Sequence, residues 1–176
     1  MTSRYIKFAK KNSELKFEGN TKGVLIIRFP VAGDSVNPEA DLIIDWGLWN
    51  RQIRLGYTFS ASRVFKLPNG ADRSFDAGWI QGQRWEALTP AERSKFPPIA
   101  PDFVIELRSA TDALPMLQEK MQEYLNAGLI FAGLINPQQQ QVEIYSLRQT
   151  PATRHLPTEL SGEDVLPEFS LNLDRY

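Results

Sequence analysis

The alternation of apolar and polar positions predicts a β-strand over residues 102–108. One face of this strand carries three apolar side chains, those of Phe103, Ile105 and Leu107. The opposite face carries Val104, Glu106 and Arg108, because side chains alternate across a strand. A carboxylate in the middle of an otherwise apolar strand is unfavourable unless it is paired or binds a ligand. This segment is therefore the first candidate for a functional site.

Hydrophobic periodicity predicts further helices and strands along the chain. Apolar residues recur at helical spacing over 39–53 and over 112–127, and Asp112 is placed to cap the second helix. Residues 1–20 are expected to form a short helix and a turn, with Glu18 near the end of the helix. Apolar runs bounded by turn residues predict further strands at 24–29, 56–66, 73–80, 129–135 and 142–145.

These elements predict an α/β fold in which helices pack on a central mixed β-sheet. The chain has 176 residues, of which 42% are hydrophobic, and this is enough for one domain with a real core. No internal repeat and no linker divides the sequence. We therefore expect a single domain over residues 1–176.

Charge and cysteine content exclude several classes of site. The formal net charge is -1, so contact with nucleic acid would need a local basic patch. The chain has no cysteine for disulfides or thiolate metal sites, and its one histidine, His155, lies in a polar region without a nucleophile-elbow motif. No apolar run approaches the ~20 residues of a membrane span and no signal peptide is visible, so we expect a cytoplasmic protein without membrane contact.

The buried position predicted for Glu106 requires a partner. A carboxylate in an apolar strand costs several kcal/mol unless it is paired or holds a metal. Arg108 on the same face offers an ion pair, and a divalent cation offers the other solution. The choice between them separates a structural acid from a catalytic one.

A second acid, Asp76, lies in the middle of the strand predicted before that of Glu106. Consecutive strands usually pair, so the two carboxylates are expected within reach of one cation, Mg²⁺ or Mn²⁺, which prefer oxygen ligands. Such a cation activates water toward a phosphodiester. Arg108 and Lys120 are candidate cations for the phosphoryl charge, and a lysine is better suited to activating water because its pKa can be lowered. Glu18 is a candidate further carboxylate.

Each candidate also has a structural interpretation. Asp76 can bond a backbone amide at a strand end, and Glu106 can pair with Arg108 alone. Lys120 and Glu123 can be solvated residues of a mostly polar helix. The four tryptophans are expected in or beside the core, at Trp46, Trp49, Trp79 and Trp85.

Short blocks of recognisable sequence are spread through most of the chain, at Phe17-Glu18, 65–71, 73–77, 96–98, 101–109, Asp112, Lys120-Met121, Glu123-Tyr124, Ala127-Gly128 and Asn136-Pro137. Together they resemble the Uma2 family, also known as DUF820. This resemblance implies a restriction endonuclease-like fold, with the core of a PD-(D/E)xK nuclease. It also implies a Mg²⁺-dependent or Mn²⁺-dependent endonuclease, a hydrolase of DNA phosphodiester bonds.

Carried over by position, the resemblance makes Asp76 and Glu106 the two acids that hold the metal. Lys120 becomes the catalytic cation, displaced from the strand onto the following helix. Glu18 matches a helix glutamate that supports the site, and Arg108 stands where the motif usually has lysine. A further departure is Phe75, where the family usually has proline before the first acid, but this change removes no metal ligand.

Two functions stay open at this point. The joint pattern of acids and lysine favours a metal-dependent nuclease. The near-neutral net charge favours a non-catalytic binding or assembly module that keeps the nuclease fold. A symmetric homodimer would suit cleavage of a duplex, with residues 149–176 as a candidate interface.

Overall fold

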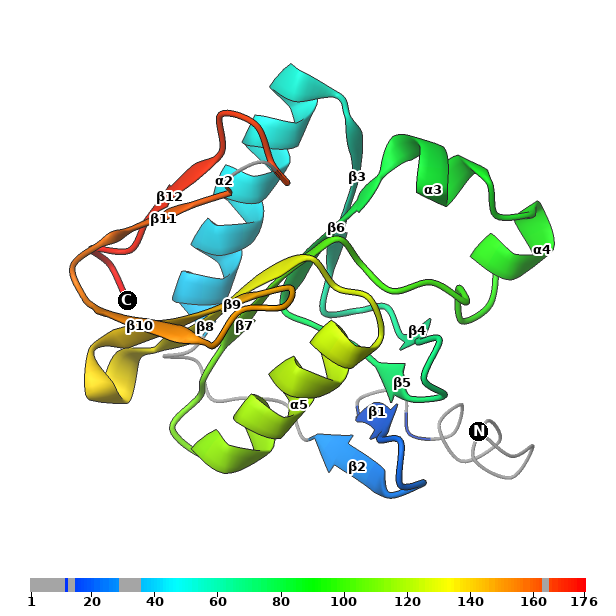
Figure 1. Ribbon diagram of the computed structural model, residues 1–176, viewed down its shortest axis with the longest axis horizontal. Coiled ribbons are helices and arrows are strands. Elements are labelled where there is room, and N and C mark those ends of the chain that lie inside the picture. The colour runs from blue at the N-terminus through cyan, green and yellow to red at the C-terminus, as the bar shows by residue number, and fades with distance from the viewer. Residues whose placement is uncertain (1–11, 13–14, 29–35, 163–164) are drawn as a thin grey trace.

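The computed structural model describes residues 12, 15–28, 36–162 and 165–176, and a six-stranded mixed sheet lies at its centre (Figure 1). The strands lie in the order β10-β9-β8-β7-β6-β3. Their bounds are Gly56–Ser60 (β3), Ala77–Gln81 (β6), Phe103–Leu107 (β7), Phe131–Asn136 (β8), Gln141–Ser146 (β9) and Ala152–His155 (β10). β7 and β8 run parallel and are joined by helix α5 (Leu114–Asn126), because parallel neighbours need a crossover connection. The other neighbouring strands of this sheet run antiparallel.

Helices cover both faces of this sheet. Helix α2 (Val36–Ile53) packs on one face, where Trp46 stacks on Phe103 with ring centroids 4.8 Å apart. Helix α5 covers the other face, where Met121 and Val104 belong to the same buried cluster. The alternation along β7 therefore divides its side chains between two cores, as the sequence predicts.

A smaller antiparallel sheet lies beside α5 in Figure 1, with strand order β2-β1-β5-β4. Its strands are β1 (Lys16–Gly19), β2 (Leu25–Arg28), β4 (Phe65–Lys66) and β5 (Asp72–Arg73). A separate hairpin is formed by β11 (Glu159–Ser161) and β12 (Ser170–Asn172). The short helices are α3 (Gly82–Glu86), α4 (Pro90–Arg93) and the 3₁₀ turn η2 (Pro137–Gln139). Strands β1 and β2 of the small sheet bring Glu18 and Arg28 toward the end of β7, where Lys120 links Glu18 to Glu106.

Three local expectations are wrong. Glu18 lies in strand β1 and not in a helix, while residues 1–11, part of the predicted helix, lie outside the described residues. Asp76 directly precedes β6 instead of lying in the middle of a strand. Asp112 does not cap α5, whose N-cap is Ala113 without a side-chain bond; Asp112 instead accepts hydrogen bonds from the backbone and side chain of Ser109. Short polar segments took these forms because tertiary contacts outweighed local preference.

The expectation for the four tryptophans agrees with the structure. The four tryptophans are buried, and two of them, Trp46 and Trp49, pack together in the core beneath α2. His155 is exposed on the edge strand β10. Within the described part of the chain, no helix combines the length and apolar character needed to cross a bilayer.

Candidate active site

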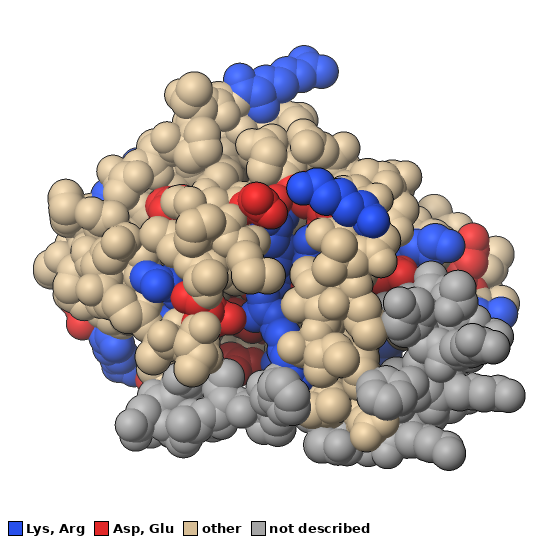
Figure 2. Space-filling view, turned by 90° about the horizontal axis from the view of Figure 1, so that it is seen from below, with Lys and Arg blue, Asp and Glu red and all other residues tan. Residues whose placement is uncertain are grey.

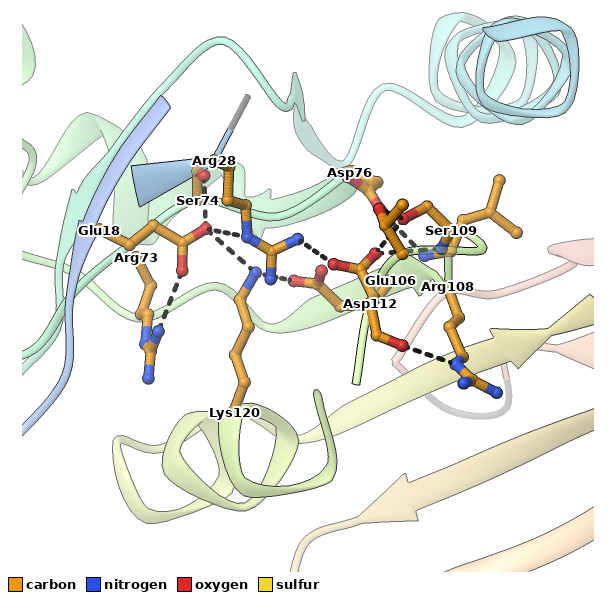
Figure 3. A network of polar contacts seen from close by, with 12 residues as sticks. Glu18, Arg28, Arg73, Ser74, Asp76, Glu106, Arg108, Ser109, Asp112 and Lys120 are labelled. Atoms are coloured by element: carbon orange, nitrogen blue, oxygen red, sulfur yellow. Dashed lines mark hydrogen bonds and ion pairs between the residues drawn. The ribbon is translucent and has the colours of Figure 1, made fainter. Parts of the chain in front are cut away.

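The two predicted acids come together at the β6–β7 ladder. The register pairs Ala77 with Ile105, so Asp76 before the first and Glu106 after the second are adjacent across the two strands (Figure 3). Asp76 Oδ2 accepts a hydrogen bond of 2.8 Å from the backbone N–H of Leu107. This bond ties the half-buried Asp76 to the strand that carries the buried Glu106. Asp76 therefore bonds a backbone amide, as its structural interpretation predicts. Its carboxylate also lies beside that of Glu106.

Lys120 reaches the same place from α5. Its side chain is buried, and its Nζ lies 2.8 Å from Glu106 Oε1 and 3.2 Å from Glu18 Oε1. The interpretation of Lys120 as a solvated helix residue is wrong. One turn further along α5, the Tyr124 hydroxyl lies 3.1 Å from Glu106 Oε1 and 2.8 Å from the backbone oxygen of Ser74. The helix thus presents an ammonium and a phenol to one carboxylate, since residues four apart share a face.

Glu18 enters the site from β1, and its carboxylate is surrounded by cations. Besides Lys120, it lies 3.0 Å from Arg73 Nη1 and 3.8 Å from Arg28 Nε, and it accepts a 2.9 Å hydrogen bond from Ser74. Burial raises the pKa of Glu18, but Lys120, Arg28, Arg73 and the Ser74 hydroxyl outweigh it and hold that pKa at about 2. Glu18 is therefore a fixed negative charge that holds Lys120 beside Glu106.

Glu106 is in the opposite electrostatic situation. Burial, together with the neighbouring carboxylates of Asp76 and Glu18, raises its pKa to about 7 against the opposing effect of Lys120 and Arg28. Near neutral pH the Glu106 carboxyl group therefore exchanges a proton. An added positive charge beside Glu106 and Asp76 would favour the ionised form, which is the form that binds metal.

Arg108 does not pair with Glu106. Its Nε donates to the backbone oxygen of Asp112 and its Nη1 to Asn136 Oδ1, each at 3.1 Å. Strand β7 ends at Leu107, so the alternation that would place Arg108 beside Glu106 stops one residue earlier. The Glu106–Arg108 ion pair, one of the two alternatives open from the sequence, does not form, and Arg108 supports the turns at the end of the strand.

The donor set at Asp76 and Glu106 fits a hard divalent cation. Their oxygens are the ligands that Mg²⁺ and Mn²⁺ prefer, and Mg²⁺ commonly binds one or two carboxylates and completes its shell with waters or substrate phosphate. Among the described residues, no group of three or more His, Cys, Asp or Glu side chains is arranged to hold a metal ion. A cation here would therefore rely on water and substrate oxygens in addition to the two carboxylates.

The sequence interpretation missed an ionic cluster behind Glu18. Arg73 connects Glu18 to Glu123, which is buried and also accepts a 2.8 Å hydrogen bond from the backbone N–H of Thr21. The expectation that Glu123 is solvated is wrong. Its spacing of three residues from Lys120 on α5 is a signal that could have placed it on the buried face.

Two further groups on α2 and β2 were missed. Partial burial and the nearby Asp76 carboxylate raise the pKa of Glu39, in the first turn of α2, while Lys16 opposes this rise. Arg28 Nη1 lies 3.5 Å from Asp112 Oδ1, so Arg28 stands between Asp112 and Glu18. No local pattern indicated either residue, because both approach the site from elements distant in sequence. Figure 2 shows basic and acidic side chains gathered in a hollow on the side of the molecule that lies lowest in Figure 1.

Comparison with known proteins identifies the fold and the family of this chain. A crystal structure described as that of "a putative nuclease belonging to DUF820" from Anabaena variabilis ATCC 29413 matches with a TM-score of 0.74 at 18% sequence identity, covering 89% of this chain and 86% of that one. At this identity the match shows a shared fold. No curated protein matches the chain. The family model described as "Uma2: Putative restriction endonuclease" matches residues 3–174, and the chain therefore belongs to the Uma2 family.

Proposed function

We propose that this protein is a divalent-metal-dependent endonuclease that hydrolyses DNA phosphodiester bonds. The observation that carries the proposal is the convergence of Asp76 and Glu106 from paired strands with Lys120 from the next helix. Membership of a family described as "Putative restriction endonuclease" supports the same reaction class. The fold alone would not, since one fold hosts many functions.

In this proposal Asp76 and Glu106 hold Mg²⁺ or Mn²⁺. The bound ion would supply water activation at neutral pH and neutralise phosphate charge. Hydrolysis adds a water oxygen to phosphorus, breaks one P–O ester bond and leaves a proton on the departing oxygen. The hydrogen bond from Leu107 fixes the Asp76 carboxylate, and the Tyr124 hydroxyl restrains that of Glu106. Both ligands are thus oriented before substrate binds.

Lys120 has the second role. Because its Nζ contacts both Glu106 and Glu18, it is held as a donor at a fixed point beside the metal-binding carboxylates. From that point the ammonium would stabilise charge that develops on the phosphoryl oxygens or orient the attacking water. Glu18 is a positioning residue for Lys120, and its low pKa of about 2 keeps it ionised throughout the neutral range.

The alternative is a binding module whose buried charges serve only the fold. Lys120 already pairs with Glu106 and Glu18, so the cluster satisfies part of its charge without a metal. The module would bind neither Mg²⁺ nor Mn²⁺ at Asp76 and would not cleave DNA. The two proposals therefore differ in measurable ways.

Cleavage of supercoiled plasmid and linear duplex DNA tests the proposal, with Mg²⁺, Mn²⁺ or chelator added to the purified full chain. We expect cleavage with either metal and none with chelator. The double variant Asp76→Ala, Glu106→Ala should lose cleavage while circular dichroism shows a folded protein, and Glu119→Ala on the exposed side of α5 should retain activity. Unchanged cleavage in the double variant would contradict the proposal.

A further inference from the structure

The described cations around Glu18 differ in their access to solvent. The side chains of Lys120 and Arg73 are 3% and 6% exposed, whereas that of Arg28 is 27% exposed. A phosphate that approaches from solvent therefore meets Arg28 before it meets either buried cation. Figure 3 shows the Arg28 guanidinium between Glu18 and Asp112, close to the carboxylates of the candidate metal site.

Arg28 is held loosely where it stands. Its ion pairs with Glu18 and Asp112 span 3.8 Å and 3.5 Å, beyond the ~2.7–2.9 Å of strong charge-assisted hydrogen bonds. Glu18 keeps Arg73, Lys120 and Ser74 as partners if Arg28 turns toward another anion. The guanidinium can thus exchange a weak ion pair for a bidentate contact with phosphate without leaving Glu18 uncompensated.

A second cation stands directly opposite Arg28. The register of the β1–β2 ladder pairs Lys16 with Arg28, and opposite residues of an antiparallel pair project from the same face. Glu18, two residues along β1, lies on that face too, so the face is turned toward the site. Lys16 is exposed, so its ammonium is open to an anion that approaches this face from solvent.

Two like charges placed opposite each other on paired strands destabilise the ladder unless an anion lies between or beside them. Nearby carboxylates supply part of this negative charge. Burial by itself would lower the pKa of Arg28, but a set of four carboxylates outweighs burial and raises that pKa: those of Glu18, Glu106, Asp112 and Asp76. The same four carboxylates would repel nucleic acid, so the entrance to the site needs exposed cations if a phosphate is to enter.

We infer that Lys16 and Arg28 form a phosphate-binding pair that holds the nucleic-acid backbone beside Asp76 and Glu106. The inference rests on the proposed nuclease function and names the groups that bring the substrate to it. Arg28 supplies a forked contact to one phosphate, and Lys16 supplies a point charge to the same or the adjacent phosphate. Contacts of this kind set affinity and position and do not select a base sequence.

Binding is measured apart from cleavage, with the full chain, a short fluorescein-labelled DNA duplex and fluorescence anisotropy over a range of KCl concentrations. One series contains chelator and a second contains Ca²⁺. Lys16→Ala and Arg28→Ala should each weaken binding about tenfold at low salt. Each should lower the slope of log affinity against log salt by about 0.9, and the double variant should lower it by about 1.8.

Two further variants separate a phosphate contact from a structural role. Arg28→Lys keeps the charge and should keep the salt slope, while it loses the forked contact and part of the affinity. Arg175→Ala removes an exposed arginine near the C-terminus and should change neither affinity nor slope. Thermal unfolding of each variant, compared with wild type, shows whether the fold is intact.

The outcomes distinguish this inference from the proposed function. Binding with an unchanged salt slope in the double variant would overturn the phosphate-binding pair, even if wild type cleaves DNA. Absence of duplex binding by wild type in both series would overturn it as well. Slopes that fall as expected would support the pair, and cleavage with Mg²⁺ is then judged separately.

Discussion

Lys120 Nζ lies 2.8 Å from Glu106 Oε1, and both side chains are buried although one comes from α5 and the other from β7. Burial and the carboxylates of Asp76 and Glu18 raise the pKa of Glu106 to about 7, against the opposing effect of Lys120. Lys120 alone therefore leaves the Glu106 carboxylate only partly compensated. A divalent cation would supply the missing positive charge, and the predictions below depend on this relationship.

Glu106→Gln should stabilise the metal-free protein at high pH. The folded-state pKa of about 7 lies above the ordinary 4.5, so between these values the folded state keeps a proton that the unfolded state loses. Wild-type stability therefore falls as pH rises through that window. The variant lacks this titration, and its free energy of unfolding relative to wild type should increase by about 2–3 kcal/mol between pH 4.5 and pH 8.

Urea unfolding with chelator at several pH values checks this prediction, with Glu119→Gln on the exposed side of α5 as the control. A difference between Glu106→Gln and wild type that stays constant with pH would show that folding does not raise the pKa of Glu106.

Arg73→Met should be strongly destabilising. Arg73 pairs with both Glu18 and Glu123, and its loss leaves these buried carboxylates short of positive charge. Breaking a buried ion pair in this way costs about 3–5 kcal/mol. The exposed pair Arg175–Asp41 offers a matched comparison, where Arg175→Ala should cost less than about 1 kcal/mol. Equal losses of unfolding free energy in the two variants would contradict a large contribution of the buried Arg73 ion pairs to stability.

Gly78→Ala should disturb both the core and Asp76. A Cβ added at Gly78 would lie 2.3 Å from Cε2 of Phe75, a buried ring next to Asp76 in sequence. Relief of this overlap should cost about 1–3 kcal/mol of stability and shift the start of β6, next to Asp76. Gly47→Ala on α2 meets no atom within 4 Å and should instead stabilise the protein by roughly 0.5–1 kcal/mol. Thermal unfolding of both variants makes the comparison, and a harmless Gly78→Ala would contradict it.

Lys120→Met should remove cleavage without removing the metal ligands. The variant loses the ammonium beside Glu106 and Glu18, so turnover should fall by roughly a hundredfold or more while duplex affinity changes little. Lys95→Met, at an exposed position before β7, is the matched control. Because Lys120 is buried, its loss also unbalances Glu18, and rates should be compared at a temperature where melting curves show both variants folded. Full turnover in folded Lys120→Met would remove Lys120 from the mechanism.

Local periodicity was sufficient to predict the sheet and the place of Glu106 in it. The two-residue alternation of 103–107 identified both cores and the face that carries the acid, and the parallel step to β8 follows from the helix between them. The restriction endonuclease-like fold is confirmed by the family and structural matches. The boundaries of a single domain and the homodimer stay predictions.

The partners of the acids could not be predicted in the same way. Lys120 and Glu18 are 102 positions apart, and no local pattern reports a contact across that distance. Arg108 would share a face with Glu106 only if β7 continued past Leu107, but the strand ends at that residue. Glu18 was expected near the end of a short helix followed by a turn, yet the pairing of β1 with β2 decides its conformation. Long-range packing therefore determined most of the charge network.

Isothermal titration of Mn²⁺ into the wild type and Asp76→Asn, each with and without a short DNA duplex, tests the central claim most directly. Because Asp76 and Glu106 are expected to hold the ion with help from substrate oxygens, wild type should release binding heat that is larger with duplex present. Asp76→Asn should lose that heat in both conditions while remaining folded. Equal heats from wild type and variant, or no heat from wild type even with duplex, would contradict a metal site at these carboxylates.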